Sequence, residues 1–207
     1  MKKIIYIMDP HCGWCYGNSD NMDKLSKEFK NSIEIEILVG GMWLGSNAPK
    51  GGIHLSQFIS EHSPRMEQVT GADVGTSFFK LTKDKTYTFS SLEPSCAIVL
   101  VKKMYSEKVM NFAKEVQKAI FIEGKRLDKI EAYLEILKQM DIETTYFEKY
   151  WMTEINISNT KSEFVRAKNI ATGYPSLFLQ SDSKFDLIAS GFFNAEVAVQ
   201  KIKAVIR

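Results

Sequence analysis

The order of the apolar segments restricts the fold of this chain more than any other feature of the sequence. Residues 2–8, KKIIYIM, form a short run rich in β-branched side chains that ends at an Asp-Pro pair, which is typical of a buried strand. Residues 19–30 then place apolar side chains at helical spacing, and residues 33–39 alternate between apolar and acidic positions before two glycines. The chain is therefore predicted to begin as a strand, a helix and a second strand with one buried face.

The middle of the chain, from about residue 53 to residue 153, has a helical pattern. A first short helix is predicted to begin at Pro64 and to end at Gly71, and amphipathic segments follow it. The C-terminal part then predicts one helix, two strands in GYPSLFLQ and KFDLIAS, and a last helix capped by Asn194. This order of strands and helices predicts an α/β protein with a helical insertion.

Composition and length exclude several classes of protein. A chain of 207 residues favours one unit with a large insertion, and a formal charge of +2 without any block of like charges gives no reason to expect a nucleic-acid partner. The apolar run near the N-terminus is shorter than the roughly 7 to 15 residues of a signal peptide, and no run reaches the ~18 apolar residues of a membrane span. Three cysteines are an odd, small number for a disulfide-stapled secreted protein. We therefore expect a cytoplasmic protein that does not contact a membrane.

Two of the three cysteines, Cys12 and Cys15, lie three positions apart where the first helix is predicted to begin. Residues at this spacing share a helix face, so the two sulfurs can approach within disulfide distance. The free N–H groups and the dipole of a helix N-terminus stabilise a thiolate, and such positions lower a thiol pKa from about 8.5 to roughly 3.5 to 7.5. Cys12 is therefore the predicted nucleophile, and the more deeply placed Cys15 is the predicted resolving thiol.

Metal and haem sites are weaker interpretations of the same cysteines. A structural zinc site needs four ligands, and the other candidates, Cys96, His11, His54 and His62, lack paired spacing. Tyr16 occupies the position where a c-type haem motif requires histidine, and three cysteines are too few for a four-thiolate iron–sulfur cluster. No metal is expected, and Cys96 is interpreted as a small buried hydrophobic residue.

The sequence resembles the DsbA-like branch of the thioredoxin superfamily, particularly its FrnE-like members. The segments that carry the resemblance are, in order, DPHCGWCYG at 9–17, PRMEQVTG at 64–71, SLEPSCAIVLVKK at 91–103, QKAIFIEGKRL at 117–127 and GYPSLFL at 173–179. The resemblance implies a thioredoxin fold, in which helices flank a central mixed sheet and an all-helical insertion interrupts the chain. Residues 1–52 and 157–207 would form the thioredoxin-like domain, and residues 53–156 the insertion.

The resemblance also implies roles for residues around the CxxC motif. Pro175 would follow a cis peptide bond and lie against the thiols, leaving the backbone of Tyr174 free to pair with an extended substrate segment. Trp14 would contribute to the substrate surface. The Gly13-Trp14 pair differs from the Pro-His or Gly-Pro pairs of better-known relatives, so Gly13 is expected to affect the redox potential, and His11 could add positive charge when protonated.

Four further positions, Tyr6, Asp9, Met42 and Trp43, do not follow the family motif or have more than one interpretation. Some thioredoxin-like proteins bury an acidic residue six positions before the first cysteine, but this chain has Tyr6 there. Asp9 is interpreted mainly as a turn former beside Pro10. Met42 and Trp43 fit a client-binding surface and the hydrophobic core equally well.

The function that these observations predict is thiol–disulfide exchange on protein or small-molecule disulfides. In a cytosol poised at roughly −220 to −320 mV the pair would be mostly reduced, so reduction or isomerisation is favoured over net oxidation. No organic cofactor is implied, and glutathione is a candidate electron donor. Two alternatives stay open. One is a glutathione-dependent kappa-type transferase or hydroxychromene-carboxylate-type isomerase, whose members usually carry serine in place of Cys12 and lack the second cysteine. The other is a non-enzymatic zinc-binding protein or chaperone.

Overall fold

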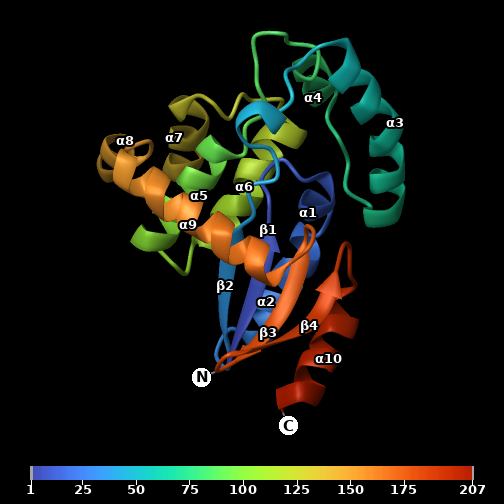
Figure 1. The fold of residues 1–207 in the computed structure, drawn as a ribbon, viewed down its shortest axis with the longest axis vertical. Helices are drawn as coiled ribbons and strands as arrows, with labels where there is room; N and C mark the ends of the chain where they lie inside the picture. Colours follow the sequence, from blue (N-terminus) through green and yellow to red (C-terminus); the bar gives the residue numbers. More distant parts are fainter. Residues whose placement is uncertain (1, 207) are drawn as a thin grey trace.

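The computed structural model describes residues 2–206, and a four-stranded mixed sheet lies at its centre (Figure 1). Strand β1 (Lys2–Met8) pairs in parallel with β2 (Glu34–Val39) and antiparallel with β3 (Ser176–Ser181), which pairs antiparallel with β4 (Lys184–Ser190). The strand order is therefore β2-β1-β3-β4. All four predicted strands are confirmed at nearly the predicted positions, and β1 occupies the buried centre that its apolar sequence predicts.

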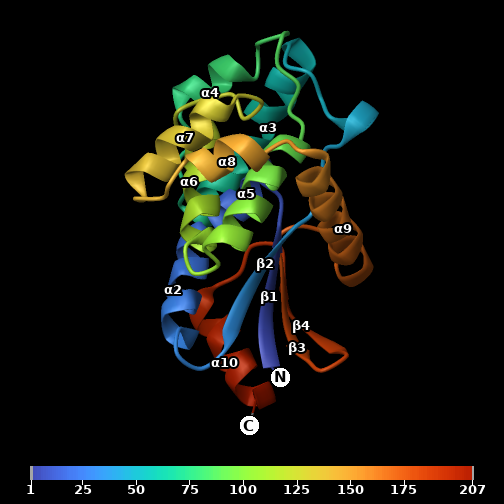
Figure 2. The same ribbon diagram turned by 90° about the vertical axis from the view of Figure 1, so that its left-hand side faces the viewer.

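Helices cover the two faces of the sheet. On one face, α1 (Gly13–Gly17), α2 (Ser19–Phe29) and α10 (Ala195–Ile206) pack over the alternate side chains of β1 and β3, which include Ile4 and Leu179. On the other face, α9 (Glu154–Ile170) packs against the side chains of the strands that point away from the first face, and together they form a smaller apolar cluster. Its buried members are Ile5, Ile7, Leu38, Ala167, Ala171 and Phe178. Figure 2 shows α2 and α10 on one side of the sheet and α9 on the other.

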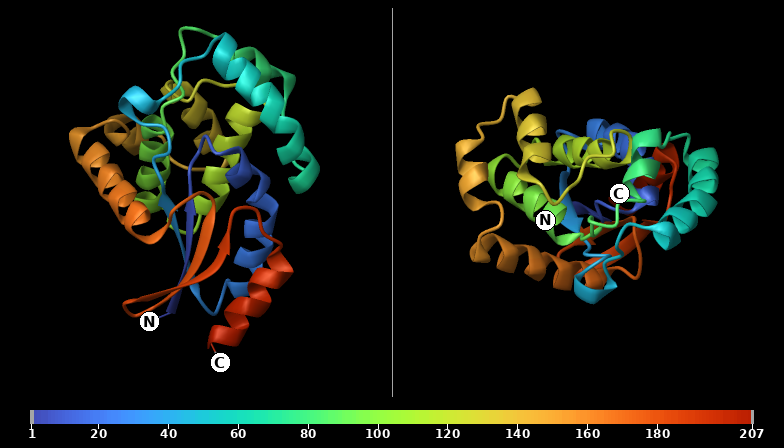
Figure 3. Two further views of the ribbon diagram at one scale, coloured as in Figure 1. Left: turned by 45° about the vertical axis from the view of Figure 1, so that its right-hand side comes forward. Right: turned by 90° about the horizontal axis from the view of Figure 1, so that it is seen from above.

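The insertion lies above the end of the sheet where β1 and β2 finish (Figure 3). A short 3-10 turn (Gly45–Asn47) leads into it. Its helices are α3 (Ile53–Thr70), α4 (Thr76–Leu81), α5 (Leu92–Met104), α6 (Val109–Phe121), α7 (Ile130–Gln139) and α8 (Thr145–Tyr150). Their buried side chains join those of the sheet in one hydrophobic cluster. The insertion therefore shares its core with the thioredoxin-like part, and the expected division between residues 156 and 157 falls inside α9.

One predicted helix start is wrong. Pro64 does not begin a helix but lies inside α3, which runs from Ile53 to Thr70 and is capped by Gly71 in the left-handed conformation (φ 72°). Proline lacks the N–H that would bond one turn back and usually kinks or breaks a helix, so the sequence argues for a start there. No helix among the described residues is both long and apolar enough to cross a membrane.

Candidate active site

The two cysteines of the CxxC motif lie where β1 passes into α1. Cys12 is the residue that caps α1, and its Sγ accepts a hydrogen bond from the Cys15 N–H at 3.4 Å. The Cys12 carbonyl accepts hydrogen bonds from the backbone N–H groups of Cys15 and Tyr16, each at 3.0 Å. Cys12 is 6% exposed and Cys15 is 1% exposed, and neither forms a disulfide in this structure. The sulfur of the predicted nucleophile thus occupies the helix start that the spacing predicts.

The loop before β3 brings a distant segment to the Cys12 sulfur. The Tyr174–Pro175 peptide bond is cis, and the Tyr174 carbonyl oxygen lies 3.7 Å from Cys12 Sγ. The Tyr174 hydroxyl donates a hydrogen bond of 2.7 Å to the Gly40 carbonyl at the end of β2. Burial raises the pKa of Tyr174 to about 12, so its hydroxyl stays protonated and can donate this hydrogen bond at neutral pH. Tyr174 therefore fixes the loop against both the CxxC motif and the end of β2.

Burial makes the two thiols chemically unequal. Desolvation raises the pKa of the Cys15 thiol well above its usual value, and the hydrogen bond and the charge interaction with Cys12 raise it further. The backbone N–H of Asp9 opposes this shift by hydrogen bonding to the Cys15 sulfur. Cys15 consequently remains a thiol at neutral pH, as the predicted resolving residue should.

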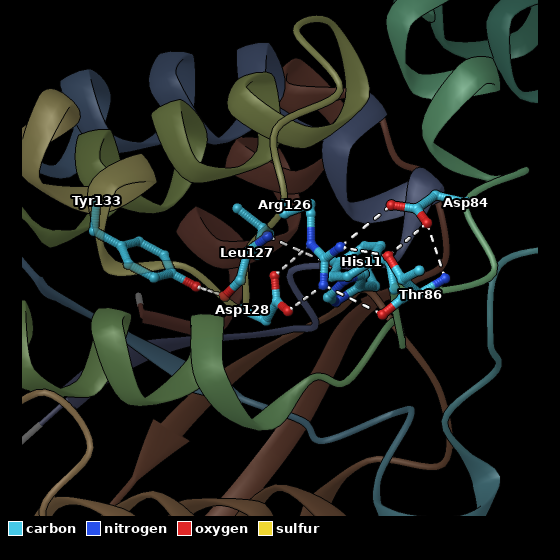
Figure 4. A network of polar contacts seen from close by, with 8 residues as sticks. His11, Asp84, Thr86, Arg126, Leu127, Asp128 and Tyr133 are labelled. Atoms are coloured by element: carbon cyan, nitrogen blue, oxygen red, sulfur yellow. Dashed lines mark hydrogen bonds and ion pairs between the residues drawn. The ribbon is translucent and has the colours of Figure 1, made fainter.

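His11 does not supply the positive charge that the sequence suggested. Its side chain is 4% exposed, and burial lowers the pKa of His11 to about 3, so the ring is neutral at physiological pH. The Nε2 atom lies 3.3 Å from the hydroxyl oxygen of Tyr87, which also accepts a hydrogen bond of 3.2 Å from the Leu127 N–H (Figure 4). Any effect of His11 on the thiols must therefore come from a neutral imidazole held by the insertion.

The polar network around Tyr87 extends to the surface of the insertion. The Arg126 guanidinium lies over the Tyr87 ring, 5.1 Å from its centroid. It also donates hydrogen bonds to the carboxylates of Asp84 and Asp128 (Figure 4). The Tyr133 hydroxyl donates to the Leu127 carbonyl. These contacts hold Tyr87 against His11 from a part of the chain that is remote in sequence.

Asp9 is a fully buried carboxylate that connects the CxxC loop to two distant segments. Its Oδ1 accepts hydrogen bonds of 2.9 Å from the His11 N–H and from the Ser91 hydroxyl, and its Oδ2 accepts one of 2.6 Å from the Met42 N–H. Desolvation raises the pKa of Asp9, and these hydrogen bonds oppose the shift. The bond to His11 is the turn contact that the sequence predicts, whereas the bonds to Ser91 and Met42 join Asp9 to the start of α5 and to the loop after β2.

A cavity of about 310 Å³ opens beside Cys12, between the CxxC helix and the insertion. Gly13 and Trp14 contribute to its lining, and so do Met42 and Trp43, which also pack against the core. Met42 and Trp43 therefore pack against the core and also face a cavity, and their role in client binding stays a prediction. The remaining lining residues are His11, Cys12, Phe58, Ile59, His62, Ser63, Met66, Val74, Phe78 and Phe121.

The described part of the chain, residues 2–206, does not bring together the ligands of a metal site. Within residues 2–206, no group of three or more His, Cys, Asp or Glu side chains is arranged to hold a metal ion. Cys96 is fully buried in α5, where desolvation raises its thiol pKa to about 11. The zinc-binding interpretation therefore has no ligand set in the described part of the chain.

A scan against protein-family models finds no match, and a search of the curated proteins also finds none. Solved structures do match. A "putative protein disulfide isomerase" from Nitrosomonas europaea is 20% identical with a TM-score of 0.85, over 99% of this chain and 97% of that one. The cytosolic disulfide reductase DsbM from Pseudomonas aeruginosa is 20% identical with a TM-score of 0.83, over 99% of this chain and 100% of that one, and its structure with GSH gives a TM-score of 0.81.

A 2-hydroxychromene-2-carboxylate isomerase is also similar, with 10% identity and a TM-score of 0.60 over 98% of this chain and 93% of that one. At these identities the similarity establishes the fold. The chain has the DsbA-like thioredoxin fold with a helical insertion, which confirms the fold expected from the resemblance.

Proposed function

We propose that this protein is a thiol–disulfide oxidoreductase that reduces or isomerises disulfides through Cys12 and Cys15. The Cys12 thiolate attacks one sulfur of a substrate disulfide, forms a mixed disulfide and releases the other half of the substrate as a thiolate. That leaving thiolate or solvent takes the proton of Cys15, and the Cys15 sulfur then attacks Cys12 Sγ. The second half of the substrate leaves, and a Cys12–Cys15 disulfide remains. Two electrons have passed from the cysteine pair to the substrate.

The observation that carries this proposal is the position of the Cys12 sulfur. It caps a helix, accepts the Cys15 N–H, and lies 3.7 Å from the Tyr174 carbonyl at the edge of a cavity. An extended substrate segment that pairs with the backbone of Tyr174 would place its disulfide against this sulfur. The raised thiol pKa of Cys15 supports the division of roles, because the resolving thiol reacts only after the mixed disulfide has formed.

We further propose that the protein acts in the cytoplasm and that glutathione returns the pair to its reduced form. Two glutathione molecules would supply two electrons and leave as glutathione disulfide, with no organic cofactor needed. The similarity in fold to DsbM, which is described as a cytosolic disulfide reductase and has been solved with GSH, supports this direction. Disulfide-containing proteins are the proposed clients.

The second candidate is a glutathione-dependent transferase or isomerase of the kappa or hydroxychromene-carboxylate type. Its support is the similarity in fold to the 2-hydroxychromene-2-carboxylate isomerase. The paired thiols of Cys12 and Cys15 weigh against it, because such reactions need no resolving cysteine.

Trapping the mixed disulfide tests the two candidates. Cys15→Ala removes the resolving thiol, so we expect client proteins bound to Cys12 when the variant is purified under alkylating conditions and analysed by mass spectrometry. Cys12→Ser is the control that should trap nothing, and Cys96→Ser in the Cys15→Ala background should trap as the parent does. Glutathione as the only adduct would favour the second candidate. Unreactive thiols with stoichiometric zinc would contradict both candidates.

A direct activity assay complements the trapping. Wild-type protein should reduce insulin disulfides with glutathione as the donor, and Cys12→Ser should abolish this activity while the circular-dichroism spectrum is unchanged. Retained reduction by Cys12→Ser would refute the assignment of the nucleophile.

A further inference from the structure

The loop that follows β4 contacts both the end of the CxxC helix and the segment before β3. In this loop, the backbone N–H of Gly191 donates a hydrogen bond of 2.8 Å to the Pro175 carbonyl. Pro175 directly follows Tyr174, whose carbonyl oxygen lies 3.7 Å from Cys12 Sγ. The position of Gly191 therefore affects where the Tyr174 carbonyl lies relative to the reacting sulfur.

The side chain of Asn18 holds this loop against the CxxC helix. Asn18 caps the C-terminal end of α1, where its backbone N–H donates to the Cys15 carbonyl at 3.2 Å. Its Nδ2 donates to the Gly191 carbonyl at 3.2 Å, and its Oδ1 accepts the Phe193 N–H at 3.3 Å and the Asn21 Nδ2 at 3.4 Å. Asn18 is fully buried, so solvent does not compete for these bonds. Both ends of the amide are thus bonded to the main chain of the loop.

Asn18 and Gly40 hold the segment before β3 from two sides. In the strand order β2-β1-β3-β4, Gly40 follows the outer strand β2 and Gly191 follows the outer strand β4. The Tyr174 hydroxyl bonds to the Gly40 carbonyl, whereas the Pro175 carbonyl bonds to Gly191, which Asn18 holds. A closed path of contacts therefore leads from the CxxC helix through the amide and the loop back to the nucleophilic sulfur.

We propose that Asn18 is a positioning residue for the disulfide substrate. By holding the loop after β4, it determines where the Tyr174 backbone lies relative to Cys12 Sγ. This inference rests on the proposed function, in which an extended substrate segment pairs with the backbone of Tyr174. Asn18 acts through the loop and not by contact with the substrate. Its loss should therefore slow the reduction of disulfides that have a peptide backbone and spare those that have none.

Two disulfides separate positioning from chemistry. The disulfide of acetyl-Ala-Cys-Ala-amide has a peptide backbone on both sides of the cysteine, and hydroxyethyl disulfide has none. Pre-reduced protein is mixed with each in excess, and the single-turnover rate constant is measured by quenching and chromatography. Since a misplacement of about 1 Å can lower a rate about 10²-fold, Asn18→Leu should slow reduction of the peptide disulfide at least about tenfold and of hydroxyethyl disulfide less than about twofold.

Asn156→Leu is the matched control. Asn156 is 5% exposed in α9, and its Nδ2 also donates to two backbone carbonyls, those of Cys96 and Trp151, at 2.9 and 2.7 Å. Both substitutions should lower the urea midpoint of unfolding, because each leaves buried backbone groups without partners. Only Asn18→Leu should change the ratio of the two rate constants. A ratio that is unchanged in Asn18→Leu, or that changes equally in Asn156→Leu, would overturn the proposal.

A second pair of variants does not depend on the folding of Asn18→Leu. Gly191 has a φ of 76° and Gly71, after α3, has a φ of 72°, and a Cβ at either position meets nothing within 4 Å. Alanine disfavours this conformation equally at both positions. Its relaxation at Gly191 would move the N–H away from the Pro175 carbonyl. Gly191→Ala should therefore slow reduction of the peptide disulfide at least about threefold relative to hydroxyethyl disulfide, and Gly71→Ala should not.

The outcomes of these assays distinguish the positioning role from the proposed function. Equal rate ratios in Gly191→Ala and Gly71→Ala, with wild-type protein active on both disulfides, would overturn the role of Asn18 and its loop alone. Reduction of neither disulfide by wild-type protein would contradict the proposed function and, with it, this inference.

Discussion

Gly40→Ala is a sharp test of the geometry around Cys12. A methyl group at Gly40 would lie 2.1 Å from Cε1 and 2.3 Å from Cζ of the Tyr174 ring. Carbon atoms in contact are normally about 3.5 Å apart, so the ring must withdraw by about 1.4 Å. The backbone φ of Gly40 is outside the left-handed region, so the requirement for glycine is this close approach alone.

The displacement has two consequences that can be measured separately. Loss of the Tyr174–Gly40 hydrogen bond costs about 1 kcal/mol and the steric overlap about 1–3 kcal/mol, so the free energy of unfolding should fall by about 2–4 kcal/mol. The Tyr174 carbonyl, now 3.7 Å from Cys12 Sγ, would shift by a similar distance to the ring. A misplacement of about 1 Å can lower a rate about 10²-fold, so kcat/KM for disulfide reduction should fall between tenfold and about a hundredfold.

Urea unfolding followed by tryptophan fluorescence gives the stability, and insulin reduction gives the rate. Gly173→Ala is the matched control, because a methyl group there meets nothing within 4 Å although the residue precedes Tyr174. In a Tyr174→Ala background, Gly40→Ala should cost less than about 0.5 kcal/mol, since the clashing ring is gone. A Gly40→Ala variant with wild-type stability and kcat/KM within about twofold of wild type would refute this account of the loop.

Three further predictions concern the buried groups near Cys12. Tyr87→Phe leaves Leu127 N–H and His11 Nε2 without partners, so the free energy of unfolding in urea should fall by about 2–4 kcal/mol. Tyr146→Phe, at an exposed site, is the control and should lower it by less than about 0.5 kcal/mol. The pKa of His11 is lowered to about 3, so its neutral form contributes stability that is present above about pH 6.5 and is lost as the pH falls towards 3. Over that window, the difference in unfolding free energy between wild type and His11→Phe should shrink by about 1.4 kcal/mol per pH unit. A difference that stays constant with pH would contradict the lowered pKa. Because the pKa of the Cys15 thiol is raised, iodoacetamide at pH 7.5 should modify Cys15 in a Cys12→Ser variant much more slowly than it modifies Cys12 in a Cys15→Ser variant. The modification rate of Cys15 should rise about tenfold per pH unit. Equal rates at pH 7.5 would contradict the roles assigned to the two cysteines.

The fold was predictable wherever the signal is local. The run at 2–8 and the alternation at 33–39 gave two strands, because burial on one or both faces of a sheet acts on neighbouring side chains. The prediction that a helix begins at Pro64 was wrong because the deciding interactions there are not local. The local preference of proline for a helix start was overridden by the packing of α3, whose buried side chains lie on both sides of that position.

The site was predictable only in its covalent motif. The spacing of Cys12 and Cys15 predicts that the two side chains lie close together, since both residues are within one helical turn. The partners of Asp9 and His11 come from residues 33, 82 and 76 positions away, and no periodicity near the motif reports them. One signal was available for Asp9, which is an acidic residue directly after an apolar strand and beside a CxxC motif. A carboxylate placed there is either a turn residue or a buried hydrogen-bond acceptor, and in this structure it is both.

The contacts of the insertion connect it to the CxxC loop at several points. The thioredoxin-like part supplies the two thiols and the Tyr174 carbonyl, which are the groups that the proposed exchange uses. The insertion supplies Tyr87, which holds His11, and the face of α3 that closes the cavity. Ser91 joins the two parts through the carboxylate of Asp9. The insertion also packs directly against the CxxC helix, where Phe121 stacks on Tyr16, and none of these contacts is a hydrogen bond to the Cys12 sulfur.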